Sequence, residues 1–147
     1  MQKEINQNIS LVKNNIAVAS KKANIDPRMV SLIAVSKKKD HEYIRTAIEL
    51  GLNDFGENYA QELASKAELL QNEDINWHFI GPIQTNKIKL ITTHASWIHS
   101  LDRPKVVDKL NNECIASNKK MNALIQINIS GEETKSGISP DTLLEFA

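Results

Sequence analysis

Apolar residues recur along this chain with two different spacings, and the order in which these spacings alternate predicts the fold. The first 24 residues predict one amphipathic helix, because their apolar residues recur at intervals of three and four. Asp26-Pro27 ends this helix, since the residue before a proline is disfavoured in helical geometry. Beyond it, short apolar runs typical of buried strands alternate with longer segments that have the helical spacing.

Five strands are predicted, each followed by a helix or by the start of one. The expected strands cover residues 32–35, 53–55, 77–80, 96–99 and 121–129, and the last has the strongest pattern. Asp40 and Asp102 are the expected N-caps of two of the helices, while 60–70 and 84–93 are the other two between strands. Ser139-Pro140 is the expected start of a last helix.

This alternation of strands and helices predicts a parallel α/β sheet with right-handed crossovers. Two architectures share it, a doubly wound sheet and a (β/α)8 barrel of the TIM type. A barrel usually needs about 250 residues, whereas this chain of 147 residues holds only about five βα units after its N-terminal helix. On the barrel interpretation, residues 1–147 are a single incomplete domain.

Composition and charge narrow the possible partners. The chain is 41% hydrophobic and 24% charged with a net charge of zero, so its charge favours neither nucleic acid nor an anionic membrane. No apolar run approaches the roughly 20 residues of a membrane span, and the first residues lack the apolar core of a signal peptide. Cys114 is the only cysteine, which excludes an intramolecular disulfide. We therefore expect a cytoplasmic protein, with Cys114 packing on a helix face.

Polar and titratable side chains gather where the predicted strands end. Lys37, Asn58, His78, His99 and Asn128 lie in or directly after the five strands, in that order. The carboxyl ends of parallel strands converge in either architecture, so these side chains predict a site for a polar, anionic small molecule. A lysine there can be partly desolvated, which lowers its pKa and frees the amine to attack a carbonyl carbon.

Each of these residues also has a purely structural interpretation. Lys37 belongs to a run of three lysines that is compatible with a solvated turn. Asn58 is compatible with a helix cap, His78 with a hydrogen-bonded core histidine, and His99 with a local turn pair to Asp102. The histidine spacing matches no common zinc motif, and no serine has the glycines of a nucleophile elbow.

Four blocks of sequence make the chain recognisable. They are Ala34-Val35-Ser36-Lys37 with Lys39; Phe55-Gly56-Glu57-Asn58-Tyr59 with Gln61-Glu62; WHFIGPIQTNK at 77–87; and Gln126-Ile127-Asn128 with Ser130-Gly131-Glu132 and Lys135-Ser136-Gly137. In this order, over about residues 30–140, they closely resemble the pyridoxal phosphate homeostasis protein family, also called the YggS/PROSC family. The WHFIGPIQTNK block is the most specific of the four.

The resemblance implies a barrel similar to the N-terminal domain of alanine racemase, the type III fold of pyridoxal phosphate proteins. It implies pyridoxal 5′-phosphate (PLP) bound as a Schiff base to Lys37, with Asn58, His78 and Asn128 near the cofactor. Members of this family hold PLP without turnover of their own. PLP-dependent apo-enzymes are the partners to which they would deliver it, and the full-length proteins are expected to be monomers.

The resemblance also implies that three further strands carry the phosphate contacts and an arginine near the ring nitrogen. Arg28, Arg45 and Arg103 do not occupy that place. Two alternatives therefore stay open beside a cofactor-holding protein. One is an enzyme of the racemase or decarboxylase kind, which would need a second acid–base group. The other is a truncated remnant without function.

Overall fold

The computed structural model describes residues 2–147, which contain one sheet of five parallel strands. The strands are β1 (Ala34–Val35), β2 (Asp54–Glu57), β3 (Asn76–Phe79), β4 (Trp97–Leu101) and β5 (Asn122–Ile125). The helices are α1 (Gln2–Lys22), α2 (His41–Glu49), α3 (Ala60–Leu69), α4 (Ile88–His94), α5 (Pro104–Ala116) and α6 (Leu143–Phe146). Three short 3-10 segments complete the list: η1 (Pro27–Met29), η2 (Thr85–Lys87) and η3 (Pro140–Thr142).

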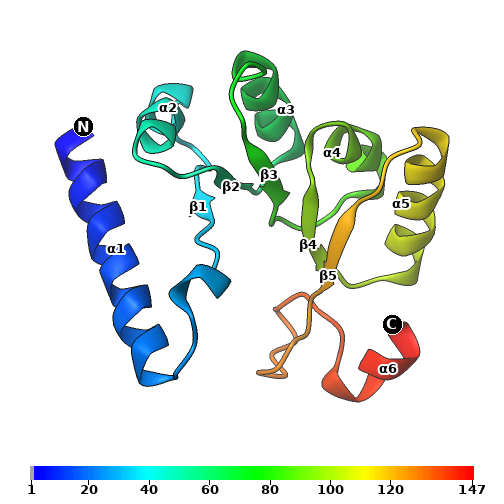
Figure 1. Cartoon of the computed structure of the whole chain (residues 1–147). Coiled ribbons are helices and arrows are strands. Elements are labelled where there is room, and N and C mark those ends of the chain that lie inside the picture. Colours follow the sequence, from blue (N-terminus) through cyan, green and yellow to red (C-terminus); the bar gives the residue numbers. More distant parts are fainter. Residues whose placement is uncertain (1) are drawn as a thin grey trace.

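The order of the strands decides between the two predicted architectures. Each strand pairs in parallel with the next strand of the chain, in the order β1-β2-β3-β4-β5. A doubly wound sheet reverses its order at a switch point, whereas a barrel adds every strand to the same edge. Figure 1 shows α2 to α5 side by side along one face of the sheet, as barrel winding requires. The predicted TIM-barrel type is therefore confirmed, as a part of such a barrel.

The face under these helices holds the hydrophobic core. The strand register sets Phe55 beside Trp77 and Phe79 beside Ile98, and all four side chains are buried. Helix residues close over them, among them Ile44, Leu63, Ile91, Val106 and Leu110. Since alternate residues of a strand point to opposite faces, the other members of each strand lie on the side that no helix covers.

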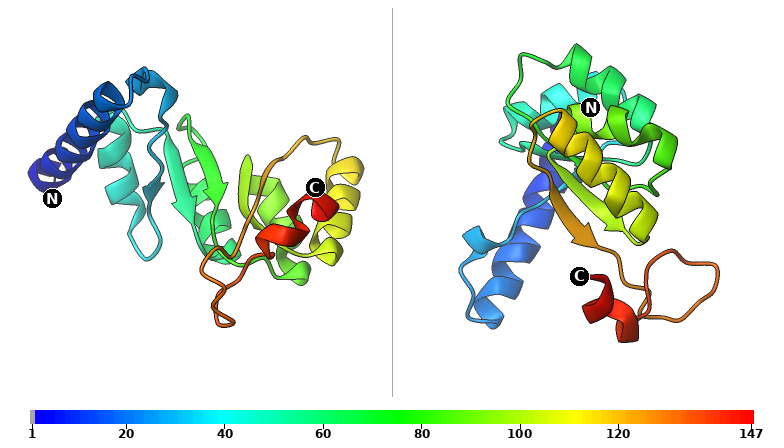
Figure 2. Two further views of the ribbon diagram at one scale, coloured as in Figure 1. Left: turned by 90° about the horizontal axis from the view of Figure 1, so that it is seen from below. Right: turned by 90° about the vertical axis from the view of Figure 1, so that its right-hand side faces the viewer.

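That second side, called the open face below, is mostly polar. Its residues in β1 to β5 are Val35, Asp54, Gly56, Asn76, His78, Trp97 and Asn122. Val35 is 53% exposed, and Leu124 further along β5 is 45% exposed. In a barrel this face is the interior. Figure 2 shows α1 lying beyond the β1 edge and α6 at the β5 end, so neither covers it.

Several predicted boundaries hold. Asp40 caps α2, its carboxylate accepting a hydrogen bond from the Glu42 amide at 3.1 Å. Ser139 caps η3, which leads into α6. Cys114 is half-buried on α5 and packs against the core as expected. None of the helices in residues 2–147 combines the length and apolar character that a membrane span needs.

Other predicted boundaries are wrong. Asp102 does not cap α5: the N-cap is Arg103, because Pro104 is the first helical residue, and the Asp102 carboxylate pairs with Arg103 at 2.9 Å instead. The strand predicted at 121–129 ends at Ile125. Beyond it the chain pairs with the returning segment at Ile138, whose amide donates to the Gln126 carbonyl at 2.9 Å. The helix predicted at 84–93 begins with the 3-10 turn η2.

Candidate functional site

Lys37 follows β1 directly and stands at the corner of a tight turn. The Ser36 amide continues the ladder to β2 by donating to the Gly56 carbonyl at 3.0 Å. The turn then closes with the Lys39 amide donating to the Ser36 carbonyl, also at 3.0 Å, while Lys38 adopts a φ of 60°. The Lys37 side chain is exposed, and no carboxylate in residues 2–147 forms an ion pair with it.

Behind this turn lies a buried group of charged side chains that the sequence analysis missed. The Lys66 ammonium group on α3 donates to the Ser36 carbonyl, to Glu57 Oε1 and to Glu62 Oε1, each at 2.7 Å. Ser36 Oγ donates to the same Glu57 oxygen at 2.6 Å. Lys66 is 6% exposed and Glu57 is fully buried. Two signals in the sequence point to this group: Glu57 falls on the helix-covered side of a strand, and Glu62 and Lys66 are four residues apart.

The two carboxylates respond differently to this environment. Burial raises the pKa of Glu57, and the hydrogen bonds from Lys66 and Ser36 only partly offset that rise. Partial burial alone would raise the pKa of Glu62 as well. Hydrogen bonds from Lys66 and from the Lys38 amide outweigh it, so the pKa of Glu62 lies below its usual value. Glu62 is therefore held as a carboxylate next to the Lys37 turn.

Asn58 follows β2 and does not cap α3. The N-cap of α3 is Tyr59, which puts Asn58 one residue outside the capping position. Within residues 2–147 its Oδ1 is buried and has no hydrogen-bond partner. Its backbone lies against Gly81 at the end of β3, where a Cβ would stand 2.1 Å from the Asn58 carbonyl oxygen. The amide oxygen is thus an acceptor beside the carboxyl ends of β2 and β3, where a ligand is expected.

His78 lies on the open face, one residue before the end of β3, and each of its ring nitrogens has a hydrogen-bond partner. Nε2 is 3.0 Å from Asp54 Oδ1, Nδ1 is 2.9 Å from His99 Nε2, and the ring stacks on Trp97 with centroids 5.8 Å apart. Nε2 is also 3.2 Å from Asn76 Nδ2. A carboxylate only accepts, so the contact to Asp54 favours the tautomer with the proton on Nε2, in which His99 donates to Nδ1. Neither nitrogen of His78 is left for a cofactor.

His99 is the last residue in a chain of hydrogen bonds that runs from Asp54 through His78. It bonds to His78 and not to Asp102, so the expected local turn pair is wrong. Burial lowers the pKa of His99, and the neighbouring His78 lowers it further. The strand register places four residues side by side in one row across the sheet: Val35, Gly56, His78 and Trp97. His99, two residues beyond Trp97, is therefore closer to the carboxyl ends of the strands than His78 is.

Asn128 lies after β5, and its amide is committed to the loop that follows. Oδ1 accepts from the Gly131 amide at 3.1 Å and from Ser130 Oγ at 3.2 Å, while Nδ2 donates to the Glu132 carbonyl at 2.8 Å. These hydrogen bonds hold the loop of residues 130–137 in its conformation. Of the four predicted site residues, the structure therefore brings Lys37 and Asn58 to neighbouring strand ends, and sets His78 deeper and Asn128 in a separate loop.

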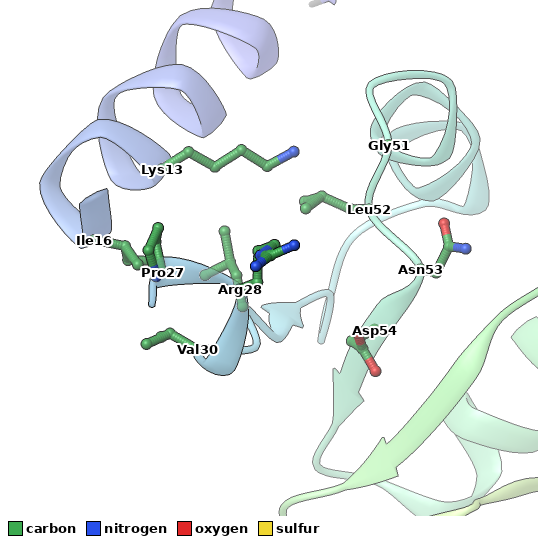
Figure 3. Close-up of a pocket in the computed structure, with 10 residues that line it drawn as sticks. Lys13, Ile16, Pro27, Arg28, Val30, Gly51, Leu52, Asn53 and Asp54 are labelled. Atoms are coloured by element: carbon green, nitrogen blue, oxygen red, sulfur yellow. The ribbon is translucent and has the colours of Figure 1, made fainter. Parts of the chain in front are cut away.

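Several cavities lie around β1 to β3, and one of about 160 Å³ borders the Lys37 turn, where Ser36, Lys39 and Tyr43 are among the residues that line it. Another of about 350 Å³ lies between α1 and the start of β2, where Lys13, Arg28 and Asp54 line it (Figure 3). It opens at the amino ends of the strands, opposite Lys37, and so is not the expected ligand side. A smaller one of about 140 Å³ lies at the carboxyl ends, lined by Asn58, Gln84 and Lys87 among others.

Comparison with known proteins identifies the family. Residues 8–147 match the family model described as alanine racemase, N-terminal domain. The chain belongs to this family. Curated relatives named pyridoxal phosphate homeostasis protein are 43% identical in Haemophilus influenzae and 45% identical in Pseudomonas aeruginosa, in each case over 97% of this chain. This confirms the resemblance that the four sequence blocks indicate. The chain spans 61% and 62% of the length of these two relatives.

Solved structures agree with this assignment. A protein from Bifidobacterium adolescentis, described only as an unknown protein, has a TM-score of 0.93 at 31% identity, covering 99% of this chain and 63% of that one. PipY of Synechococcus elongatus with PLP bound has a TM-score of 0.73 at 30% identity, covering 87% of this chain and 61% of PipY. Alanine racemase of Streptomyces coelicolor is 14% identical over 94% of this chain and 37% of its own, with a TM-score of 0.60, which supports the shared fold alone.

Proposed function

We propose that this chain binds PLP through a Schiff base at Lys37 and serves PLP homeostasis. The observation that carries the proposal is the Lys37 amine itself, which is exposed, outside any ion pair in residues 2–147, and held on an ordered turn at the carboxyl end of β1. The names of the relatives and the PLP bound to PipY support the same cofactor.

The residues of this chain fit such a cofactor. When bound, PLP supplies an aldehyde that a lysine amine captures reversibly, which keeps the free aldehyde away from other amines. Lys37 offers that amine, and the unpartnered Oδ1 of Asn58 offers a hydrogen-bond acceptor at the neighbouring strand end. His99, next to His78, is a further polar group toward the same end of the open face. We propose His78 and Asn128 as supports of this site that act through His99 and through the 130–137 loop.

Lys37 is a better attachment point than its two neighbours. Lys38 has left-handed backbone geometry, with a φ of 60°, and its amide is bound by Glu62 at 2.6 Å. The Lys39 ammonium group lies over the Tyr43 ring on α2, 5.4 Å from its centroid, and so is directed away from the open face. Lys37 is the member of the triplet that is free of both constraints.

We propose that the chain holds PLP without turnover. Catalysis on PLP needs a second acid–base group facing the attachment lysine. The carboxylates of Glu57 on β2 and Glu62 on α3, which lie behind the Lys37 turn, are both bound by Lys66. A cytoplasmic location and delivery to PLP-dependent apo-enzymes remain predictions. A racemase-like activity is the second candidate, favoured only by the shared fold.

The phosphate contacts belong to the same proposal. The chain spans about three-fifths of its relatives' length, and barrel phosphate sites commonly use the loops after strands seven and eight. We propose that these loops lie in the part of the relatives beyond the match. Residues 1–147 then carry the lysine side of the site, as one part of a single barrel domain.

Titration with PLP tests the proposal. We expect the visible absorbance of a protein-bound Schiff base in the wild type, its loss in Lys37→Ala and its retention in Lys38→Ala, which removes the same charge from the adjacent position. Equal absorbance in all three proteins would mean that surface lysines react at random. Incubation of the PLP-loaded protein with L-alanine is expected to give no D-alanine, and its appearance would favour the racemase-like candidate.

A further inference from the structure

We propose that Lys66, together with Glu57 and Glu62, is a buried ionic clamp that makes Lys37, and neither Lys38 nor Lys39, the attachment point for the cofactor. The inference rests on the proposed function and adds three positioning residues to it. None of the three needs to touch the cofactor. They act on the backbone on both sides of Lys37.

The contacts that carry this inference flank Lys37 in the sequence. On its amino-terminal side, the Lys66 ammonium group holds the Ser36 carbonyl at 2.7 Å. On its carboxyl-terminal side, Glu62 Oε1 holds the Lys38 amide at 2.6 Å. Lys66 and Glu62 are themselves joined at 2.7 Å on one face of α3. The peptide units around Lys37 are thus tied to a single helix by charge-assisted hydrogen bonds.

Burial makes this connection strong. The Lys66 side chain is 8% exposed and that of Glu57 is fully buried, with 2.7 Å between their charged atoms. Charge-assisted hydrogen bonds are about twice as strong as neutral ones, and a buried charge that loses its partner is costly. Lys66 therefore stays with Glu57 at the end of β2, and through Glu62 it fixes the turn after β1 relative to the neighbouring strand.

A fixed turn gives each of the three lysines its own direction. Lys37 is the first corner residue of the turn and follows Ser36, whose amide still belongs to the ladder with β2, and we infer that its side chain keeps to the open face. The left-handed Lys38 departs from strand geometry, and Lys39 lies over Tyr43. When the clamp is released, the turn is free to rotate and all three amines become comparable in reach.

The test maps the site of attachment. Wild type, Glu62→Ala and Glu62→Gln are mixed with PLP, reduced with borohydride and analysed by tandem mass spectrometry of the peptide that spans Lys37 to Lys39. We expect the ratio of label on Lys37 to label on Lys38 and Lys39 to fall about tenfold or more in Glu62→Ala, the effect of losing one charge-assisted hydrogen bond. Glu62→Gln keeps an acceptor for the Lys38 amide and is expected to restore much of the ratio.

Glu68→Ala is the matched control, because Glu68 lies on the same helix with its side chain exposed. It is expected to keep the wild-type ratio. Lys66→Arg and Lys66→Met extend the series, with thermal unfolding by circular dichroism to show that each variant is folded. An unchanged ratio in folded Glu62→Ala and Lys66→Met would overturn the clamp.

A second measurement separates the clamp from the proposed function. Hydrogen exchange of the Lys38 amide is followed in protein without PLP, where the contact to Glu62 predicts protection in the wild type and Glu68→Ala and at least tenfold faster exchange in Glu62→Ala. A fast-exchanging Lys38 amide in the wild type would overturn the clamp whatever PLP does. Protection there without label on Lys37 would leave the clamp standing and reject the proposed function alone.

Discussion

At the scale of single residues, the site depends on one close approach between two strand ends. Gly81 packs so tightly against Asn58 that an added Cβ would stand 2.1 Å from its carbonyl oxygen and 2.7 Å from its carbonyl carbon. Both contacts are to backbone, which cannot rotate away as a side chain can. The glycine in the WHFIGPIQTNK block is therefore explained by packing, and it positions Asn58.

Gly81→Ala should lower the free energy of unfolding by about 1–3 kcal/mol, because the backbone of Asn58 must move to admit the methyl group. Urea denaturation measures this change. Gln84→Ala, at an exposed position three residues further on, is expected to stay within about 0.5 kcal/mol of the wild type. An equally stable Gly81→Ala would contradict the close approach.

The sequence predicts where a side chain lies in the fold only when the strand pattern around it determines that place. The place of Lys37 after β1 is predictable because an apolar strand precedes it, whereas its choice among three adjacent lysines comes from the family resemblance and stays a prediction. The place of Lys66 is not predictable, since its burial depends on how α3 docks against β2 and β3, and a lysine on a helix is usually exposed. For Asn128 the sequence gives its place after the last strand but not the local hydrogen bonds that use its amide.

At the scale of elements, the hydrogen-bonded line from Asp54 through His78 to His99 crosses three strands of the open face. Trp97 stacks on His78 and lies 6.3 Å from the His99 ring centroid, and Asn76 donates to Asp54 at 2.6 Å. No helix covers this face, so these hydrogen bonds and ring contacts take the role that apolar packing has on the other face of the sheet. They tie β2, β3 and β4 together through side chains.

The lowered pKa of His99 predicts how stability depends on pH. In the unfolded chain His99 takes up a proton near its ordinary pKa of 6.5, whereas in the folded protein it does so only at lower pH. The unfolded state therefore binds more protons in that window, and stability should fall as the pH is lowered from 7.5 through 6.5.

Thermal unfolding at pH 7.5 and 6.0 measures this dependence. His99→Gln, whose amide can still donate to His78, should show a smaller loss between the two pH values. His94→Gln removes a histidine outside the line and should behave as the wild type. If His99→Gln loses as much stability as the wild type, another group is responsible.

The sequence predicts which helices and strands are present better than it predicts the residues at which they begin and end. The spacing of apolar residues gives every strand and all the main helices, because burial imposes the periods of 2 and 3.6. The cap at Asp102 fails by one residue, since Pro104 is the first helical residue and leaves Arg103 in the capping position. The long strand pattern at 121–129 is divided between β5 and the bridge from Ile127 to Ile138, a long-range pairing that local pattern does not reveal.

At the scale of the whole molecule, the sheet of residues 2–147 has two edges. β1 and β5 each pair with one neighbour in this part of the chain. The open face beside them exposes apolar side chains, among them Val35 and Leu124. Unpaired strand edges next to exposed apolar surface favour association between chains.

The polypeptide 1–147 on its own should therefore self-associate. We expect its sedimentation coefficient to rise with concentration over the micromolar range, and Leu124→Lys, which puts a charge on the open face beside the β5 edge, to reduce this rise. A single monomeric species at all concentrations would contradict the exposed edges.

The pattern of strands and helices alone leaves a choice between two windings, and the resemblance of the four sequence blocks to a known family selects the barrel. Alternating strands and helices occur in both, and the order of strands within a sheet depends on long-range pairing. The strand order β1-β2-β3-β4-β5 is that of a barrel, and in a barrel the open face is the interior. Lys37 then lies at the carboxyl end of β1, which in a barrel faces the mouth where ligands bind.

The most direct test is the intact mass of the protein after incubation with PLP and reduction with borohydride. At PLP equal in concentration to the protein, we expect one reduced PLP adduct on the wild-type chain and none on Lys37→Ala, with Lys39→Ala labelled like the wild type. Equal labelling of wild type and Lys37→Ala would contradict it.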